Sequence, residues 1–457
     1  MGKLFGTDGI RAKVGVYPLT EDMIYKIARA SALYAKGQNA YKRKAVRISI
    51  AKDTRTTGDL LEERLIAGIT STGVDVVKLG ILPTPCSAYL VKKLKDDLGI
   101  VISASHNDID DNGLKFFAYN GYKLSSSAED EIEKILFDEV EGEGANEAEA
   151  QPQGKAKEEK DAIPLYIDYL KKVVDGCDLS KYRIAVDCAF GALTSLIPHL
   201  SKELGVGLLS INDVPDGNNI NKQSGSLFPN VVSEHVLKEK CDCGFAFDGD
   251  GDRLLACDEK GQILDGDFIL AIIGRYLYEK GLLNRNSIAT TFMSNLGLEM
   301  SVGQWGGRLV KADVGDKFVL EKMLKGKLNL GGEQSGHIIL LDYSTTGDAL
   351  LTALYILKIM SEEGKSLSQL ARCMYKFPQI LLNVEVGHKK PIEELPKLNK
   401  AISKSEAKLG SKGRIYVRYS GTEDKLRIMI EGQNQVQIKE LAEDIAATAQ
   451  EELQCQS

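Results

Sequence analysis

The sequence predicts an α/β protein of three successive, similar domains with mixed, mainly parallel sheets, followed by a smaller C-terminal α+β domain. Short apolar runs of strand length alternate with amphipathic helical patterns along most of the chain, which is typical of sheets built largely from parallel strands. This alternation pauses and resumes twice, giving three units of about one hundred residues that look like a divergent triplication. From about residue 374 two strand patterns follow each other directly, which indicates a different, smaller domain.

In the first unit, Thr20 is predicted to cap a helix whose first turn carries Glu21 and Asp22, because acidic side chains stabilise a helix N-terminus. The following patterns occupy residues 46–50 (strand), 59–72 (helix), 74–79 (strand), 86–94 (helix) and 99–103 (strand). The composition changes at residues 138–162, where Glu, Ala, Gly, Gln and Lys dominate and large apolar residues are almost absent. We interpret this stretch as a solvated loop or tether beside a domain boundary.

The remaining units are predicted from the same kind of hydrophobic pattern. The second is predicted from residues 182–186 (strand), 191–204 (helix) and 206–211 (strand), and the third from 265–278 (helix), 287–292 (strand), a helix after Asn295, a strand at 328–331 and a long helix after Gly347. The C-terminal domain is predicted from 379–386 (strand), 392–408 (helix), 414–418 and 425–431 (strands) and 435–453 (helix). The expected domain limits are therefore 1–160, 161–262, 263–373 and 374–457.

The composition excludes several classes of protein. With 43% hydrophobic and 27% charged residues the chain is an ordinary globular protein, and its formal net charge of -7 argues against a nucleic-acid-binding surface. The 8 cysteines lack the spacing of zinc sites or disulfide frameworks, so a reducing cytoplasm is the expected location. The first residues lack the apolar core of a signal peptide, and the longest apolar run, 349–360, is too short to span a bilayer. We expect no membrane partner and no nucleic-acid partner.

A hydroxyl-rich loop follows the predicted strand at 99–103. The apolar run stops at SASHN (103–107), which places two serines and an imidazole at the rim of a sheet, where α/β proteins bind their ligands. A polar turn that only leaves the sheet is equally compatible with this stretch alone. Local chemistry also leaves open whether Ser103 or Ser105 would be the reactive serine.

The segment FDGDGDR (247–253) is the strongest local signal for chemistry. Its three carboxylates, Asp248, Asp250 and Asp252, would repel one another unless a cation neutralised them, and the glycines between them let the backbone fold around one centre. Oxygen ligands without His or Cys favour Mg²⁺ over zinc. A calcium EF-hand fits poorly, because Arg253 stands where that loop requires glycine and strand-like residues flank the segment.

Two further polar loops suggest binding of a sugar and of a phosphate. In GGEQSGH (331–337), Glu333 and Ser335 could bind sugar hydroxyls, whereas His337 could equally be a buried histidine with a structural partner. RYSGTE (418–423), together with Arg427, combines hydroxyls, backbone amides and two guanidiniums, which are the donors that bind phosphate; the alternative is a turn with exposed arginines. Together with the serine loop and the metal loop, they predict an enzyme that moves a phosphoryl group on a sugar phosphate, with a serine carrying the phosphate beside Mg²⁺.

These motifs resemble those of the α-D-phosphohexomutase superfamily, and the resemblance runs along the whole chain. It is carried by FGTDGIR (5–11), SASHN (103–107), DGDGDR (248–253), GEQSGH (332–337) and SGTE (420–423), with support from PDGNNIN (215–221), VGDKFV (314–319) and TTGD (345–348). Gln334, where a methionine could stand, favours the branch that acts on glucosamine phosphates. The resemblance implies four domains arranged around a central cleft that holds the active site.

The resemblance also implies roles for individual residues. Ser105 matches the phosphoserine, and the three aspartates with an oxygen of the Ser105 phosphate match the ligands of one Mg²⁺. Lys115 matches a lysine implicated in proton transfer, while Arg11 and His106 match residues lining the phosphoserine site. The implied substrate contacts are Arg253, Glu333, Ser335, His337, Arg418, Ser420, Gly421, Thr422 and Arg427.

The implied reaction interconverts glucosamine 6-phosphate and glucosamine 1-phosphate through glucosamine 1,6-bisphosphate or a similar primer, and its product would feed UDP-N-acetylglucosamine synthesis. The partner is then a small sugar phosphate, and a homodimer is compatible with the family. The alternatives are a member of the superfamily that prefers glucose or mannose phosphates and a non-catalytic sugar-phosphate-binding protein. The chain departs from the family pattern at Asp108, Tyr419 and Asp424, each of which stands where the family usually has proline; Asp108 suggests a more mobile loop after Ser105.

Overall fold

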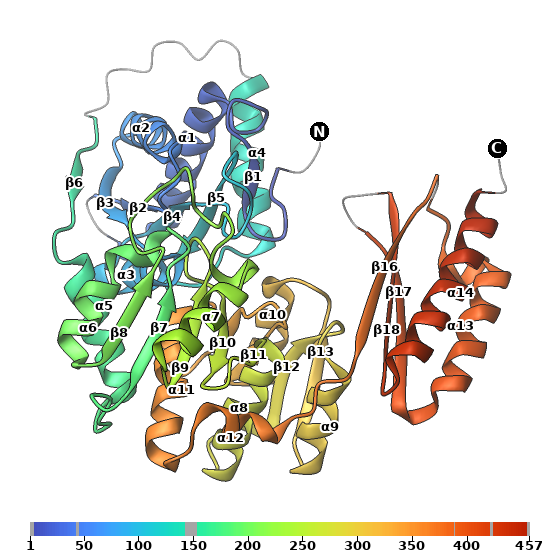
Figure 1. The fold of residues 1–457 in the computed structure, drawn as a ribbon. Helices are drawn as coiled ribbons and strands as arrows, with labels where there is room; N and C mark the ends of the chain where they lie inside the picture. Colours follow the sequence, from blue (N-terminus) through green and yellow to red (C-terminus); the bar gives the residue numbers. More distant parts are fainter. Residues whose placement is uncertain (1–3, 43–44, 142–152, 388, 421–423, 455–457) are drawn as a thin grey trace. The chain divides into compact units, whose positions relative to one another are not determined.

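The computed structural model describes residues 4–42, 45–141, 153–387, 389–420 and 424–454. Its contacts divide the chain into two compact units, one made of Met1–Met293 with Gly307–Cys373 and the other of Ser294–Gly306 with Met374–Ser457. The first unit contains three α/β sheets and the second contains one antiparallel sheet, which confirms the predicted fold class (Figure 1).

The N-terminal sheet has six strands in the order β1-β5-β4-β2-β3-β6. These are β1 (Ile10–Lys13), β2 (Arg47–Lys52), β3 (Asp75–Ile81), β4 (Leu98–Ile102), β5 (Asp111–Ala118) and β6 (Ala156–Glu158). The strands β2, β3, β4 and β6 run parallel, whereas β5 is antiparallel to both β4 and β1. The helices of this part are α1 (Glu21–Gln38), α2 (Gly58–Thr70), α3 (Thr84–Leu94) and α4 (Ser126–Glu141).

Strand β4 is apolar throughout because both faces of its sheet are covered, as is usual for parallel strands. Ile100 and Ile102 belong to the core that the sheet forms with α1, α2 and α4. Val101 points to the other face, where it packs with Ala88 and Val91 of α3. The alternation follows from the two-residue period of a strand and leaves the carboxyl end of β4 firmly held.

The second sheet has the order β11-β10-β9-β7-β8 and the third the order β13-β12-β14-β15. Their strands are β7 (Arg183–Asp187), β8 (Gly207–Ile211), β9 (Cys243–Phe247), β10 (Leu254–Asp258), β11 (Ile263–Leu264), β12 (Ser287–Thr291), β13 (Arg308–Ala312), β14 (Leu330–Gly332) and β15 (Ile338–Leu340). The helices are α5 (Ala162–Lys171), α6 (Ile197–Leu204), α7 (Asn230–Glu239), α8 (Gly266–Glu279), α10 (Asp316–Gly326), α11 (Ala349–Glu363) and α12 (Leu367–Leu370). Short 3₁₀ turns lie at Lys172–Val174, Ala192–Ser195, Gly225–Leu227, Asn284–Asn286 and Ala371–Cys373.

The three α/β sheets share one feature that places the predicted site loops. In each sheet a strand that is parallel to one neighbour is followed by an antiparallel partner, and these hairpins are β4–β5, β9–β10 and β14–β15. The connections of these hairpins are residues 103–110, 248–253 and 333–337, which contain the serine, aspartate and sugar motifs. The motifs therefore occupy equivalent positions in three similar domains, at the carboxyl end of a buried strand, where ligands commonly bind.

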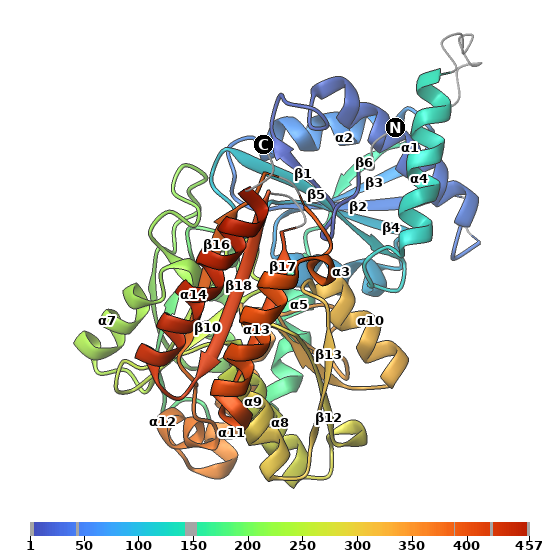
Figure 2. The ribbon, with the colours of Figure 1, turned by 90° about the vertical axis from the view of Figure 1, so that its right-hand side faces the viewer.

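The second unit is an antiparallel sheet covered by two helices. Its strands β16 (Gln379–Glu385), β17 (Gly413–Tyr419) and β18 (Lys425–Gly432) have the order β16-β18-β17. Figure 1 and Figure 2 both show α13 (Pro396–Leu409) and α14 (Gln435–Gln454) side by side over one face of this sheet. Short turns at Ile392–Glu394 and Gly410–Lys412 complete the unit.

Helix α9 (Leu296–Gln304) belongs to the second unit although the strand before it, β12, belongs to the first. The buried carboxylate of Glu431 on β18 explains this association. It accepts hydrogen bonds from Asn295 Nδ2 (3.1 Å), from the backbone N–H of Leu296 (3.1 Å) and from Arg414 Nε (2.6 Å). The helix start is therefore tied to the antiparallel sheet, within the range 263–373 that the sequence analysis assigned to the third domain.

Three details of the sequence prediction were wrong. Within the supposed tether 138–162, residues 138–141 end α4 and Ala156–Glu158 form β6, whose exposed side chains explain the polar composition; residues 142–152 lie outside the described part. The helix predicted at 191–204 is split into a 3₁₀ turn and α6. The helix predicted from residue 392 begins at Pro396, because proline favours the first turn of a helix.

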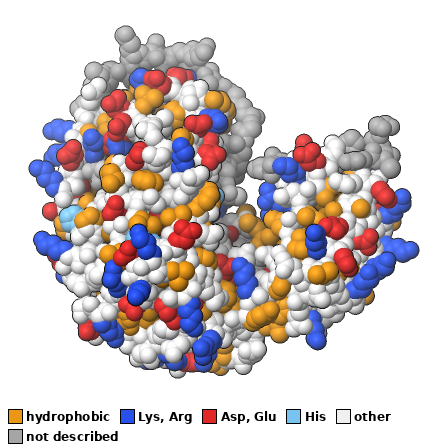
Figure 3. Space-filling view, in the orientation of Figure 1, with side chains coloured by type: hydrophobic (Ala, Val, Ile, Leu, Met, Phe, Trp, Pro, Cys, Tyr) orange, Lys and Arg blue, Asp and Glu red, His pale blue; other side chains and the backbone are white. Residues whose placement is uncertain are grey.

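Among the described residues, no helix is long and apolar enough to cross a membrane. The apolar run 349–360 lies in α11, where Leu351, Ile356 and Ile359 are buried in the first unit. Figure 3 shows acidic and basic side chains interspersed over the visible face.

Candidate active site

The turn after β4 holds Ser105 in an unusual backbone conformation. Its φ of 53° lies in the left-handed region, which costs energy for residues other than glycine and recurs at functional sites. The backbone N–H of Ser105 donates to Ser103 Oγ (2.9 Å), and Ser103 Oγ donates to Asp53 Oδ2 (2.6 Å). Ser103 is buried and both of its hydroxyl bonds are used to hold the turn.

Ser105 has a different environment. Its Oγ donates to Asp248 Oδ2 at 2.7 Å and lies 3.4 Å from His106 Nδ1. The hydroxyl of Ser105 therefore reaches the aspartate loop across 143 positions of sequence, and the hydroxyl of Ser103 contacts Asp53 instead. This geometry separates the two serines, which local sequence could not do.

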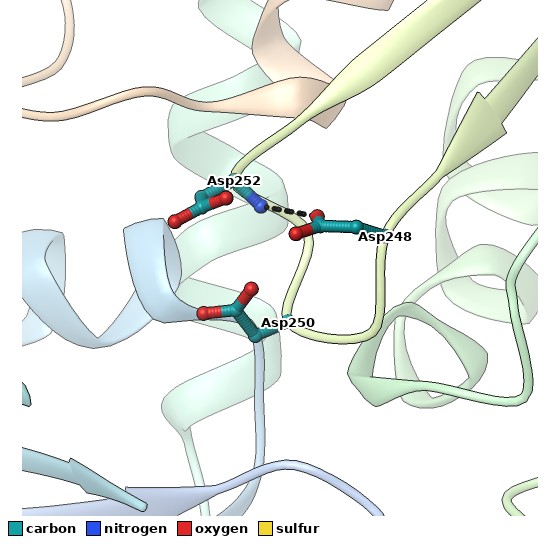
Figure 4. Close-up of side chains that lie close together, drawn as sticks. All are labelled: Asp248, Asp250 and Asp252. Carbon is teal, nitrogen blue, oxygen red and sulfur yellow. Dashed lines mark hydrogen bonds between the residues drawn. The ribbon is translucent and has the colours of Figure 1, made fainter. Parts of the chain in front are cut away.

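The three aspartates of the β9–β10 connection form a buried cluster. Figure 4 shows the three side chains close together, and one oxygen from each lies within 4.8 Å of the others. Asp248 Oδ1 accepts from the backbone N–H groups of Asp252 (3.1 Å) and Arg253 (3.0 Å). Asp250 Oδ1 and Asp252 Oδ1 are buried without a hydrogen-bond partner among the described residues. Hard oxygen donors left unpaired in this way fit a divalent cation such as Mg²⁺.

The charges of the cluster are unequal. Burial, followed by repulsion from Asp252 and Asp250, raises the pKa of Asp248 well above its ordinary value. Burial acts in the same direction on Asp252, but the nearby ammonium of Lys115 holds the pKa of Asp252 below its ordinary value. The cluster is thus strained by like charges and depends on neighbouring cations.

Lys115 is the buried cation of this cluster. Its Nζ lies 2.6 Å from Asp250 Oδ2, 3.0 Å from Asp252 Oδ2 and 3.2 Å from Asp8 Oδ2. Burial disfavours the charged amine, but these carboxylates outweigh it and raise the pKa of Lys115. The amine therefore contacts Asp250 and Asp252 of the cluster, whereas the Ser105 hydroxyl contacts the third aspartate, Asp248.

Asp8, Lys123 and Asp316 extend the charge network beyond the residues that the sequence analysis selected. Asp8 pairs with Arg11, Lys115 and Lys123, and Lys123 also pairs with Asp316 at the start of α10. Burial opposes the charge of Asp8, but these cations lower the pKa of Asp8 well below its ordinary value. The sequence signal was present, because Asp8 lies within FGTDGIR and Asp316 within VGDKFV, yet nothing local indicated that the two motifs meet.

The sequence also provided no indication of Arg55, whose guanidinium binds the main chain of the serine loop. The fully buried guanidinium donates to the carbonyl oxygens of Ser105 (3.2 Å), Asn107 (2.8 Å), Asp108 and Asp111 (2.9 Å). It also pairs with Asp53, which accepts the Ser103 hydroxyl. The only available signal was an Asp-Thr-Arg run after β2, which by itself does not indicate an arginine that binds four carbonyl groups.

The other side of the loop is held by the second domain. Asn221, in the motif PDGNNIN, donates to the Ser105 carbonyl oxygen at 2.8 Å. Arg253 Nη1 lies 3.5 Å from His106 Nε2, and Arg11 Nη1 donates to Asn107 Oδ1 at 3.3 Å. The first unit therefore brings together Ser105, His106, Arg11, Lys115, the three aspartates and Arg253.

The predicted sugar loop lies in the β14–β15 connection. Glu333 is buried, and its Oε1 accepts from the backbone N–H of Gly315 (3.1 Å), while Ser335 is exposed. His337 is buried, its ring nitrogens have no hydrogen bond to a described residue, and Nε2 lies 3.6 Å from Asp316 Oδ2. An added Cβ on Gly347 would lie 2.5 Å from the His337 ring, so the histidine is tightly packed.

The predicted phosphate loop belongs to the second unit. Arg418 and Arg427 are directly opposite each other on the antiparallel pair β17–β18, and Arg427 Nη2 donates to Ser420 Oγ at 3.4 Å. Like charges in such a cross-strand pair are destabilising unless an anion or other acceptor compensates them. Gly421 and Thr422 lie outside the described residues.

The structure accommodates two departures from the family pattern, Asp108 and Asp424. The carbonyl of Asp108 accepts from Arg55 and from the N–H of Asp111 (3.2 Å), so its anchor does not require a proline at this position. The side chain of Asp424 is largely exposed, and Lys389 Nζ lies 3.4 Å from its Oδ1, which offsets part of its negative charge.

Comparisons with known proteins cover the whole chain. Four family models match: phosphoglucomutase/phosphomannomutase alpha/beta/alpha domain I over residues 2–143, domain II over 164–261, domain III over 265–377 and the C-terminal domain over 381–448. The phosphoglucosamine mutase of Carboxydothermus hydrogenoformans is 46% identical over 451 residues, covering 98% of this chain and 99% of that protein. That of Clostridium acetobutylicum is 46% identical over 448 residues, covering 98% of each.

Solved structures agree in fold. A phosphoglucomutase/phosphomannomutase family protein from Burkholderia thailandensis superposes with a TM-score of 0.77 at 23% identity, over 98% of this chain and 97% of that one. The N-acetylphosphoglucosamine mutase of Aspergillus fumigatus, solved with GlcNAc-6P and magnesium, gives a TM-score of 0.67 at 18% identity, over 98% and 96%.

Proposed function

This chain belongs to the phosphoglucomutase/phosphomannomutase family, and we propose that it interconverts glucosamine 6-phosphate and glucosamine 1-phosphate, the reaction of a phosphoglucosamine mutase. One observation supports this most directly: the Ser105 hydroxyl donates to Asp248 within a buried carboxylate cluster. Relatives that share 44–46% identity over nearly the full chain carry that enzyme name.

In the proposed reaction Ser105 carries the phosphoryl group. When the enzyme acts on glucosamine 6-phosphate, the bond between Ser105 Oγ and phosphorus breaks, and the sugar O1 bonds to phosphorus and loses its proton. The bisphosphate then reverses its orientation in the site. The bond from phosphorus to O6 breaks, and the phosphoryl group returns to Ser105 Oγ. Each half-reaction moves one phosphoryl group and one proton in opposite directions, so the net change is an isomerisation. Lys115 is the proposed proton carrier, because it lies beside the carboxylate cluster that holds the serine.

The proposed metal ligands are Asp248, Asp250, Asp252 and an oxygen of the Ser105 phosphate, and a bound Mg²⁺ would stabilise negative charge on the phosphoryl group during transfer. The other residues act directly on the loop and the phosphate. Arg55 and Asn221 hold the main chain around Ser105, while Arg11, His106 and Arg253 supply donors beside it.

Substrate recognition is assigned to the remaining loops. Glu333, Ser335 and His337 are proposed to bind the sugar. Arg418, Ser420 and Arg427, together with Gly421 and Thr422, are proposed to bind the phosphate that is not transferred. We also propose the domain limits 1–160, 161–262, 263–373 and 374–457, which give each domain one of the four loops, and a cytoplasmic location.

A substrate panel tests the proposed function. We expect kcat/KM for glucosamine 6-phosphate to exceed the values for glucose 6-phosphate and mannose 6-phosphate at least ~10-fold, because a site built to pair a polar group discriminates against substrates that lack it. The assay contains Mg²⁺ and a hexose 1,6-bisphosphate primer. Equal or reversed preference would assign the chain to the glucose and mannose enzymes of its family. No turnover of any sugar, with unphosphorylated protein, would favour the non-catalytic binder.

Metal removal tests the aspartate cluster. Chelation with EDTA should lower kcat at least ~100-fold, since the cation supplies most of the charge stabilisation, and added Mg²⁺ should restore it. Mg²⁺ should also raise the melting temperature of the wild type but not of Asp250→Asn, because only the intact cluster binds the ion. Retention of full activity in excess EDTA would contradict the metal assignment.

A further inference from the structure

The first unit contains a second pocket that shares no residue with the proposed active site. It has a volume of about 500 Å³ and lies between the end of α3, α5, the turn after β5 and the segment after β15. A space of this size accommodates a small organic ligand of the size of a nucleotide. Nothing in the proposed phosphoryl transfer uses it.

One wall of this pocket is aromatic. The rings of Tyr89 on α3 and Tyr169 on α5 are stacked, with centroids 4.4 Å apart and an interplanar angle of 21°, and Tyr343 also lines the pocket. Flat aromatic faces at a concave surface suit the stacking of a planar ring. The other lining groups include the amide of Asn120 and the hydroxyl of Thr345.

The hydroxyl group of Tyr169 is a second feature of this wall. The oxygen is shielded from solvent and has no hydrogen-bond partner among the described residues, which is uncommon for a buried polar atom. Burial, reinforced by Asp348, raises the pKa of Tyr169, so the side chain stays neutral and the ring that it offers to a ligand carries no charge.

The rim of the pocket is cationic. Lys92, Lys93 and Lys95 line it at the end of α3, and all three are exposed. Within the part of the chain that the structure describes, neither Lys92 nor Lys93 forms an ion pair. The acidic groups Asp168, Asp348 and Asp342 act on the tyrosines of the wall, whereas the groups that line the exposed rim are lysines. Such a rim attracts an anion in a chain whose overall charge is -7.

We propose that this pocket binds a nucleoside phosphate, with the planar base against the Tyr89–Tyr169 wall and the phosphate at Lys92 and Lys93. A sugar phosphate would satisfy the lysines but would leave the aromatic wall unused. An inorganic anion would leave the pocket largely empty. A ring that carries a phosphate uses both features together.

The walls of the pocket also contact the aspartate loop at their far ends. Thr84, the first residue of α3, donates from its hydroxyl to Asp250 Oδ2 and from its N–H to the Asp250 carbonyl oxygen (2.9 Å). Tyr166 of α5 donates to Asp348 (2.6 Å), and the next residue, Ala349, donates its N–H to the Gly251 carbonyl oxygen (3.2 Å). A ligand in the pocket therefore contacts elements that hold the proposed metal loop, and titration at several Mg²⁺ concentrations would measure any coupling between the sites.

Calorimetric titration of the full-length protein tests the proposal without relying on turnover, so it succeeds or fails independently of the proposed reaction. The probes are AMP, UMP, ribose 5-phosphate and adenosine, and glucose 1,6-bisphosphate is present at saturation to occupy the phosphate sites of the active site. We expect AMP or UMP to bind with one-to-one stoichiometry, and ribose 5-phosphate and adenosine to bind at least ~10-fold more weakly.

Two variants and one matched control locate the site. The double substitution Lys92→Glu with Lys93→Glu, and separately Tyr169→Leu, should each weaken nucleotide binding at least ~10-fold. The control is Lys238→Glu with Lys240→Glu, which makes the same charge change on exposed lysines at the end of α7 and should leave the affinity unchanged. Unchanged melting temperatures of the lysine variants establish that they fold.

Several results would overturn the proposal. These are no heat of binding with either nucleotide, displacement of the nucleotide by the bisphosphate, or an equal loss of affinity in the α7 control. Tighter binding of a single-stranded oligonucleotide than of the mononucleotides would indicate a nucleic-acid surface in place of a nucleotide pocket.

Discussion

Ser105→Ala should yield a protein without covalent phosphate and lower kcat at least ~1,000-fold, because the group that accepts and donates the phosphoryl unit is removed. Ser103→Ala should keep the phosphate and retain measurable turnover. The structural reason is that the Ser105 hydroxyl donates to Asp248 (2.7 Å), whereas the Ser103 hydroxyl donates to Asp53 (2.6 Å). Intact-mass measurement of protein purified from cells and a primed activity assay check both expectations.

Ser103→Ala serves as the matched control because it removes a hydroxyl two residues away in the same turn. It leaves the Ser105 N–H and Asp53 each without one partner, so we expect a loss of about 1–3 kcal/mol in the free energy of unfolding. Its kcat should fall far less than that of Ser105→Ala. Loss of phosphate in Ser103→Ala with retention in Ser105→Ala would reverse the assignment of the two serines.

Arg55→Met is expected to have the second largest effect among these variants, although Arg55 is proposed to act only through the loop that it holds. Four carbonyl groups and Asp53 each lose the donor that Arg55 supplies, which should cost about 3–5 kcal/mol in the free energy of unfolding, as for other broken buried pairs. The displaced serine should lower kcat about 100-fold, since an error of 1 Å in the position of a reacting group can cost that much. KM should change little, because the proposed substrate contacts are elsewhere.

Arg55→Lys and Arg47→Met separate positioning from general stability. Lysine restores a charge beside Asp53 but has only three donors on a single nitrogen, so Arg55→Lys should regain stability more than kcat. Arg47 lies at the start of β2, where it pairs with Asp96 (2.7 Å) away from the serine loop, so Arg47→Met should lower the melting temperature with kcat nearly unchanged. Assays below all three melting temperatures compare folded proteins. A parallel fall of kcat in Arg47→Met would show that Arg55 has only a stabilising role.

Much of the candidate site could be predicted because its side chains lie close together in short segments of the chain. The metal cluster needs three carboxylates on one loop, and Asp248, Asp250 and Asp252 lie within five residues of one another, so a single segment carries the signal. The same holds for SASHN, whose hydroxyls follow an apolar strand. Periodicity identified most strands and helices for a similar reason, because burial of one face is a local pattern.

The errors in the fold have a common cause. Residues 156–158 are all exposed and include Lys157 and Glu158, so nothing local marked them as the strand β6, which pairs with the edge of β3. The contacts of α9 were hidden in the same way, because Glu431, more than a hundred positions later, ties the start of this helix to the antiparallel sheet. When a segment is held by a partner that is distant in sequence, its own hydrophobic pattern does not reveal the contact.

The amino-acid sequence was sufficient to indicate the α/β class, the repeated domains, the cation-binding aspartates and a serine loop at the rim of a sheet, because each depends on side chains that are close along the chain. The local chemistry of the serine loop could not choose between Ser103 and Ser105, a choice that rested on the family resemblance, and the sequence did not indicate Arg55, Asp8 or the Lys123–Asp316 pair. Those depend on contacts between segments that meet only after folding: Ser105 with Asp248, Arg55 with the carbonyls of the serine loop, and Lys123 with Asp316. Desolvation on burial makes such contacts strong enough to set charges and backbone conformation, and burial of this kind is a property of the folded chain.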